Sequence, residues 1–207
     1  MRWQPESDHR VMPWANGRGS TKEIATYPSG EAWVWRLSLA DVNEDGAFSL
    51  LPDTDRSLVV AAGKGMRLTT DGADATVVHA FESVSFSGDC ATRAELLDGP
   101  VRDLNLMVRR TAEPRTPHLE VRSFVRGEEV GLEEAVALVV LRGALTLTVS
   151  SACFPYAPLR CRVDRFDAVL PTEGVDGRLL VAADAVVAFA FLRSEDGRPA
   201  DAGRPAD

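Results

Sequence analysis

The chain has 207 residues, of which 45% are hydrophobic and 26% are charged, and its net charge at pH 7 is −8. This length allows one large domain or two small β modules, and the composition is that of a globular protein. An acidic chain without a basic stripe would repel a phosphate backbone. We therefore expect no nucleic-acid partner.

The sequence also argues against membrane insertion and secretion. No apolar run approaches the roughly 20 residues that a membrane helix needs, and the first residues show no signal peptide. Cys90, Cys153 and Cys161 are odd in number and are not spaced as CxxC pairs. Such cysteines are typical of reduced thiols. We expect a cytoplasmic protein.

Short strands separated by Gly, Pro and Asp dominate the predicted secondary structure. The clearest strand covers 33–39, where period-two alternation separates Trp33, Trp35, Leu37 and Leu39 from Val34, Arg36 and Ser38. Asp71-Gly72 predicts a hairpin between extended runs at 66–70 and 73–79. Another strand follows Gly99-Pro100 and covers 101–109. A short helix is predicted only at 128–136.

The second half repeats the pattern of the first. Leu58–Gly63 matches Leu138–Gly143, and each run is followed by another predicted strand. We therefore predict an all-β protein with an N-terminal half at 1–110, which carries the pocket, and a structural or interaction half at 118–193. Prolines around 111–117 suit a joint between the halves. Residues 196–207 contain Gly-Arg-Pro-Ala-Asp twice and predict a disordered tail.

Many short strands with Gly turns favour a sandwich or a jelly-roll barrel, the fold in which many cupins hold a metal. The usual cupin signature has two His before a Glu, and a Gly after it. If that glycine is Gly63, the Glu position holds Arg56, and the His positions fall on Ser49 and Leu51 or on Leu50 and Pro52. Arginine cannot replace a carboxylate ligand. We expect neither a metal nor a cofactor.

The strand at 101–109 carries an unusual polar face. Alternation places Asp103, Asn105, Met107 and Arg109 opposite Leu104, Leu106 and Val108. One interpretation is a solvated face of an antiparallel sheet. The other is a pocket in which Arg36 and Arg109 clamp a carboxylate, Asp103 and Asn105 orient them, and Ser38 adds a donor.

A glycine-rich loop adds two further candidate ligand-binding residues. Trp14 and Asn16 precede Gly17 and Gly19, so an indole and an amide stand in a flexible segment. The alternative is a simple turn with Trp14 packed in the core. The full candidate binding site is Trp14, Asn16, Arg36, Ser38, Asp103, Asn105 and Arg109.

Three blocks of sequence resemble the HutD/Ves family of cupin-like proteins. They are Pro13-Trp14-x-Asn16-Gly17-x-Gly19-x-Thr21-x-Glu23-Ile24; Trp35-Arg36-x-Ser38-x-Ala40 through Phe48-Ser49 to Asp55-Arg56; and Leu97-x-Gly99-Pro100-Val101-x-Asp103-x-Asn105-x-Met107-x-x-Arg109. Together they cover roughly 10–110. The chain departs from the usual family pattern at Ala15, Arg18, Ala47 and Asp53.

The resemblance implies two cupin-like jelly-roll halves in one chain, a bicupin, with no established enzymatic activity. It also implies a setting in bacterial histidine catabolism or a stress response. A role proposed for the family is to bind a small carboxylate metabolite, such as urocanate or a formylated glutamate, and so restrain flux. A homodimer is left open.

Three hypotheses about function follow. The first is a non-catalytic, metal-free binder of a small anionic metabolite with a regulatory role. The second is a metal-independent isomerase or lyase that uses Asp103 as a base and Arg109 as an electrostatic stabiliser. The third is a protein-interaction module whose polar strand faces are solvated.

Overall fold

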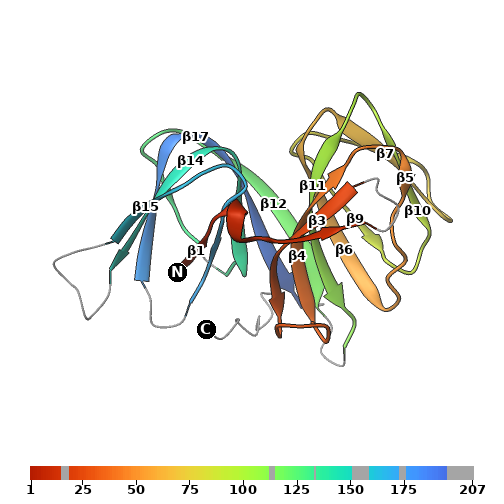
Figure 1. The fold of residues 1–207 in the computed structure, drawn as a ribbon, viewed down its shortest axis with the longest axis horizontal. Helices are drawn as coiled ribbons and strands as arrows, with labels where there is room; N and C mark the ends of the chain where they lie inside the picture. The colour runs from red at the N-terminus through yellow and green to blue at the C-terminus, as the bar shows by residue number, and fades with distance from the viewer. Residues whose placement is uncertain (15–18, 112–114, 133, 151–158, 173–175, 195–207) are drawn as a thin grey trace. The chain divides into compact units, whose positions relative to one another are not determined.

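The computed structural model describes residues 1–14, 19–111, 115–132, 134–150, 159–172 and 176–194. Within these ranges the regular elements are β-strands and one 3-10 turn, η1 (Glu6–Asp8). The chain divides into two compact units (Figure 1). Most of one unit is Arg10–Leu119, and most of the other is Met1–His9 with Glu120–Phe191. The predicted all-β class is confirmed, and the predicted tail at 196–207 lies outside the described residues.

The unit formed by Arg10–Leu119 contains two antiparallel sheets (Figure 1). The six-stranded sheet has the order β2 (Arg10–Pro13), β3 (Gly19–Tyr27), β4 (Trp35–Val42), β11 (Val101–Arg109), β6 (Thr54–Ala62), β9 (Ser83–Ser87). The four-stranded sheet has the order β5 (Gly46–Ala47), β10 (Thr92–Leu96), β7 (Gly65–Thr70), β8 (Thr76–His79). The strands predicted at 33–39 and 101–109 correspond to β4 and β11, and the predicted Asp71-Gly72 hairpin joins β7 to β8.

Apolar side chains from both sheets of this unit form one buried cluster. The six-stranded sheet contributes Val42, Leu58, Val60 and Val101, and the four-stranded sheet contributes Met66, Leu68, Val78 and Ala94. The opposite side of β4 and β11 is also buried, since Leu37, Leu39, Leu104 and Leu106 are fully inaccessible. The polar residues of β4 and β11, among them Ser38, Asp103 and Asn105, are therefore buried together with the apolar ones.

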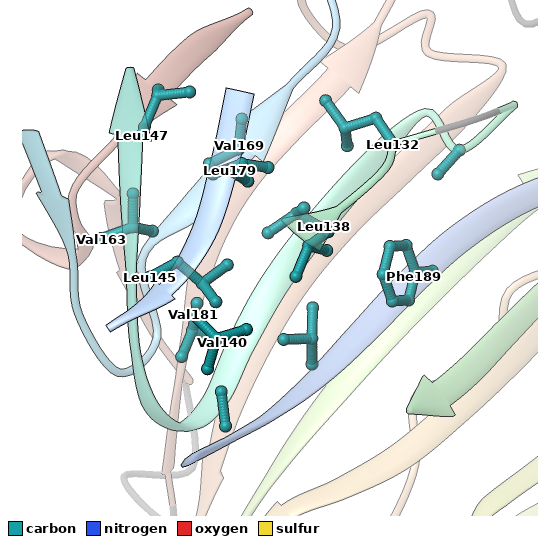
Figure 2. Close-up of a cluster of buried hydrophobic side chains, with 14 of the residues drawn as sticks. Leu132, Leu138, Val140, Leu145, Leu147, Val163, Val169, Leu179, Val181 and Phe189 are labelled. Atoms are coloured by element: carbon teal, nitrogen blue, oxygen red, sulfur yellow. The ribbon is translucent and has the colours of Figure 1, made fainter. Parts of the chain in front are cut away.

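The second unit is built on a seven-stranded sheet. Its main path is β1 (Arg2–Gln4), β16 (Ala168–Leu170), β14 (Ala137–Ser150), β17 (Asp176–Arg193) and β12 (Thr116–Phe124). Two short strands lie off this path: β13 (Glu129–Val130) pairs with β17, and β15 (Leu159–Val163) pairs with β14. Figure 2 shows its core, in which aliphatic side chains of β14, β16 and β17 gather and Phe189 lies at one end of the cluster.

The first residues of the chain belong to this second unit. β1 pairs with β16, with Trp3 opposite Val169. The indole Nε1 of Trp3 donates to Oδ2 of Asp167 over 3.0 Å, and the backbone amide of Glu6 donates to Oδ1 of the same carboxylate over 2.8 Å. These partners are more than 160 positions away in sequence. The sequence pattern alone therefore did not indicate that Met1–His9 belongs with the C-terminal unit.

The two matched glycines of the repeat share a backbone conformation. Gly63 and Gly143 both have positive φ, 96° and 80°. A Cβ at Gly63 would lie 2.7 Å from the carbonyl oxygen of Pro100, and a Cβ at Gly143 would collide with the carbonyl of Asp184. Each module therefore needs glycine at the same point in its strand pattern. The first module breaks there into β6 and β7, whereas β14 continues through it with a bulge.

The short helix predicted at 128–136 is wrong. Glu129–Val130 forms β13, whose residues pair with Leu180 and Leu179 of β17. The carbonyl of Glu128 accepts from the amide of Val181. These backbone groups are thus satisfied by strand pairing, which outweighs the weak local preference for helix.

Candidate functional site

A cavity of about 420 Å³ lies in the unit formed by Arg10–Leu119. Its polar wall comes from alternate positions of adjacent strands in the six-stranded sheet, and its other wall from β5, the segment after it, and β10. The lining residues are Trp14, Thr21, Arg36, Ser38, Ala40, Val42, Glu44, Gly46, Ala47, Phe48, Ser49, Leu51, Arg56, Ala94, Asn105 and Met107. A cavity of this size suits a small metabolite.

Strand register brings the polar residues into two rows. Met107 on β11 lies opposite Arg56 on β6 and opposite Arg36 on β4. In the next row on the same face, Asn105 lies opposite Ser38 of β4. Because side chains two residues apart point to the same face, both rows face the cavity. The predicted period-two alternation therefore places polar groups together, as the pocket interpretation requires.

The polar face is not solvated. Ser38 is 1% exposed, Asn105 2% and Arg56 5%. A solvated face would leave such side chains in water, whereas here the second wall of the unit covers them. Burying polar groups is costly unless they are paired or serve a ligand.

Arg56 is the most enclosed cation of the cavity. Its guanidinium packs against the edge-to-face pair of Phe48 and Phe86, with its Cζ 4.7 and 5.0 Å from their centroids. Nη2 donates to Oδ1 of Asn105 over 2.9 Å. Its Nε is buried without a hydrogen-bond partner among the described residues. Burial lowers the pKa of Arg56 to about 10, an effect that Asp103 opposes and Arg36 adds to.

Arg36 is the second cation of the cavity and is only partly satisfied. Nη2 is 3.5 Å from the sulfur of Met107, a weak acceptor. Its Nε, like that of Arg56, is buried without a partner in the described part of the chain. Burial lowers the pKa of Arg36, the charge of Glu23 opposes this, and Arg109 contributes to it. The guanidinium of Arg36 is thus only partly satisfied by the described residues.

Behind the cavity wall, Asn105 connects Arg56 to Asp103. The side-chain amide nitrogen of Asn105 donates a short hydrogen bond to Oδ1 of Asp103. Asp103 is completely buried, and its Oδ2 has no partner within the described ranges. Burial raises the pKa of Asp103 to about 7, although the positive charge of Arg56 opposes this shift. Asp103 does not itself line the cavity.

Trp14 is held at the cavity by the hairpin of β2 and β3. Its backbone amide donates to the carbonyl of Gly19, and its Nε1 donates to Oγ1 of Thr21 over 2.9 Å. A Cβ on Gly19 would lie 2.8 Å from the Trp14 ring and would overlap the carbonyl of Asp41. Only glycine at position 19 lets β3 come so close to the Asp41 carbonyl and to the ring of Trp14.

The structure brings four predicted site residues into one cavity: Trp14, Arg36, Ser38 and Asn105. Arg109 does not line the cavity, although Arg36 and Arg109 both pack on the ring of Trp33. It is the last residue of β11, its side chain is exposed, and its Cζ stacks 4.4 Å from the centroid of Trp33. Asp103 lies behind Asn105, and Asn16 is outside the described residues. The cavity lining therefore holds Arg56 beside Arg36, and the predicted clamp of Arg36 with Arg109 stays a prediction.

Sequence reasoning missed Arg56 as a site residue. In the sequence, Arg56 stands out only because it occupies the position where a metal-binding cupin has a glutamate ligand. The available signal was that Arg56 shares a strand face with Leu58 and Val60 of the apolar run that follows it, where a charged side chain must find a buried partner.

The lining of this cavity does not fit a transition metal of the kind many cupins carry. Two guanidinium groups point at it, and arginine has no lone pair to offer a cation. Within the described residues, no group of three or more His, Cys, Asp and Glu side chains is arranged to hold a metal ion.

A chain of two β units, one of them with a polar cavity lined by its six-stranded sheet, is a cupin-like protein. Solved structures support this class through the fold alone. Vicilin from hazelnut (Corylus avellana) is 8% identical with a TM-score of 0.66, covering 91% of this chain and 84% of its own. A cupin 2 conserved barrel domain protein from Leptotrichia buccalis is 10% identical with a TM-score of 0.58, covering 89% and 96%.

A sequence model described as HutD matches residues 6–188, and the chain belongs to this family. A conserved protein of unknown function from Pseudomonas aeruginosa PAO1 is 31% identical over 93% of this chain and 98% of its own, with a TM-score of 0.74. HutD from Pseudomonas fluorescens SBW25, solved in a formate condition, is 26% identical over 93% and 99%, with a TM-score of 0.62. The predicted resemblance to the family and the predicted two cupin-like halves are confirmed.

Curated relatives align over shorter stretches. An uncharacterised 21.2 kDa protein in the hutC 3′ region of Pseudomonas putida is 43% identical over 48% of this chain and 54% of its own length. Protein Ves of Cronobacter sakazakii is 34% identical over 60% of this chain and 71% of its own. The match thus spans about half the length of the Pseudomonas putida relative.

In the described part of the chain, no helix is long and apolar enough to cross a membrane.

Proposed function

We propose that this protein binds a small carboxylate metabolite in the cavity, without turning it over, and thereby modulates histidine utilisation or a stress response. One observation carries the proposal: two arginines, Arg36 and Arg56, line one cavity beside Ser38 and Asn105, and the Nε of each lacks a hydrogen-bond partner among the described residues. Guanidinium N–H groups bind carboxylates with charge-assisted hydrogen bonds.

The remaining lining supports a small ligand with both polar and apolar parts. Ser38 and Asn105 line the cavity beside the arginines, while Trp14, Phe48 and Met107 offer apolar surface. Urocanate and formylated glutamate combine a carboxylate with a compact organic body, so they are the first compounds to test. The names of two relatives, HutD and a protein in the hutC 3′ region, support a link to histidine utilisation.

Catalysis has less support from the geometry. The base considered in the sequence, Asp103, is fully buried behind Asn105, and Arg109 stacks on Trp33 outside the cavity lining. A general base must reach the proton that it removes. The cavity therefore suits binding better than turnover, and a protein-interaction role has no comparable observation in its favour.

Ligand-induced stabilisation tests the proposal. A carboxylate at 100 times its Kd should add about 2.7 kcal/mol to the free energy of unfolding. For a chain of this size the Tm should rise by roughly 5–10 °C. The panel is urocanate, formylglutamate, formate, histidine and glutamate, each incubated and then assayed for chemical change. A panel that leaves the Tm unchanged would reject binding, and consumption of a ligand would reject the non-catalytic role.

A further inference from the structure

The orientation of Asn105 links the cavity to a buried carboxyl. Arg56 has only donors, so the oxygen of the Asn105 amide must face it. The amide nitrogen then faces Asp103 and donates to Oδ1. Charge at the cavity is therefore transmitted through one side chain to a carboxyl with no direct access to solvent.

Each arginine of the cavity has a carboxylate within the protein that acts on it. Glu23 on β3 raises the pKa of Arg36, and Asp103 raises that of Arg56, in both cases against burial. The two pairs are formally neutral. A bound carboxylate therefore adds a negative charge that the site does not balance, in surroundings where buried charges interact strongly.

The groups facing Asp103 show where that charge can be relieved. Arg56 approaches from β6 and favours the ionised form, whereas Asp41 on β4 disfavours it. Asp41 is itself held by Arg102 of β11, whose Nε is 2.5 Å from Oδ1. On its own strand, Asp103 accepts from Asn105 at Oδ1 only, and Oδ2 has no partner in the described residues. Oδ2 is thus a place for a proton.

We propose that carboxylate binding in the cavity takes up one proton from solvent at Oδ2 of Asp103, so that the site binds an anion and a proton together. This inference rests on the function proposed above. Neutralising Asp103 releases Arg56 from its internal counter-charge and leaves its guanidinium to the ligand. Asp103 is therefore a positioning residue that acts through Asn105 and Arg56, without touching the ligand.

The sign of the pH dependence follows. In the free protein the pKa of Asp103 is about 7, and a bound anion raises it further. Below that value Asp103 is already protonated, so the affinity is independent of pH. Above it, each bound carboxylate must bring a proton, so the Kd rises by up to about tenfold per pH unit until the pKa of the complex is reached.

Calorimetry with formylglutamate, whose groups do not titrate in this window, measures the uptake directly. Titrations at about pH 8 in buffers of different ionisation enthalpy should give close to one proton bound per ligand. In Asp103→Asn, which retains an oxygen for Asn105, uptake should vanish, the Kd should lose its pH dependence, and binding at about pH 9 should be tighter than in the wild type. Asp98→Asn, at an exposed carboxylate in the same unit, should behave as the wild type.

The outcomes separate the two proposals. Saturable binding without proton uptake overturns this inference and leaves the proposed function standing, as does uptake that persists in Asp103→Asn. Failure of formylglutamate and of every other carboxylate in the panel to saturate the protein overturns both. If Asp103→Asn does not fold, the buffer series on the wild-type protein still decides.

Discussion

Nη2 of Arg56 donates to Oδ1 of Asn105 over 2.9 Å, and this bond joins neighbouring strands at the wall of the cavity. The same amide donates to Asp103 through its nitrogen, so an arginine that faces the cavity and a fully buried carboxyl share one intermediary. Removing any member leaves a buried polar group without its partner. The cavity's function and the unit's stability should therefore respond to the same substitutions, in ways that can be told apart.

Replacing Arg56 with Gln should weaken carboxylate binding most. Gln can still donate to Asn105, but it removes the charge that packs against Phe48 and Phe86. Truncating one partner of a buried charged pair costs about 2–5 kcal/mol, so the Kd measured by calorimetry should rise by about thirtyfold or more. Arg67→Gln is the matched control, because the side chain of Arg67 is 49% exposed in the same unit. Equal affinities in the two variants would remove Arg56 from the site.

Asn105→Ala should destabilise the protein even without a ligand. The substitution leaves Nη2 of Arg56 and Oδ1 of Asp103 buried and unpaired, and each unsatisfied group costs about 1–3 kcal/mol. Urea denaturation should therefore show a loss of about 2–5 kcal/mol. Asn43→Ala, at an exposed position, should stay within about 0.5 kcal/mol of the wild type. A loss of stability as small as that of the control would mean that Asn105 does not connect Arg56 to Asp103 by hydrogen bonds.

Most of one wall of the site could be predicted from the sequence. Period-two alternation in two apolar strands identified Arg36, Ser38 and Asn105, because few residues of that type stand on a simple solvated face. Trp14 was found through its glycine-rich loop, and Gly19 proves to be needed for the contact with its ring. These signals are local, because strand alternation and loop composition depend only on residues that are close in sequence.

The partner of Arg36 could not be predicted, because it depends on register. Arg56 comes opposite Met107 only through the pairing of β6 with β11, which includes an irregularity at Arg102/Asp103. A slip of one residue would turn Arg56 to the other face. Likewise, Arg109 alternates correctly with Asn105 but stands at the strand's end, where it stacks on Trp33. Alternation gives the face of a strand and leaves open how far along it the cavity extends.

The stability of the unliganded protein should fall as the pH rises from about 4 to about 7. Burial raises the pKa of Asp103 to about 7 from an unfolded value near 4, so the folded state binds more protons in this window. The stabilisation is complete below the unfolded pKa and is lost as the pH rises through the folded one. Its full size is at most about 4 kcal/mol.

Urea denaturation of the wild type and Asp103→Asn at several pH values isolates this contribution. Other titrating groups affect both proteins, so the difference between their unfolding free energies should shift in favour of Asp103→Asn as the pH increases. A difference that is constant from about pH 4 to about pH 8 would show that Asp103 stays ionised in the fold.

Gly19→Ala should impair binding through Trp14. A Cβ there would overlap the carbonyl of Asp41 and lie 2.8 Å from the Trp14 ring, so the ring must move from the cavity. The Kd for formylglutamate should rise about tenfold, and the emission of Trp14 should change with it. Gly30→Ala is the matched control: Gly30 has a φ of 104° but no neighbour within 4 Å of an added Cβ. It should lose about 1 kcal/mol of stability from backbone strain alone and keep its affinity. If both variants bind formylglutamate equally well, Trp14 has a structural role only and does not contribute to the affinity for the ligand.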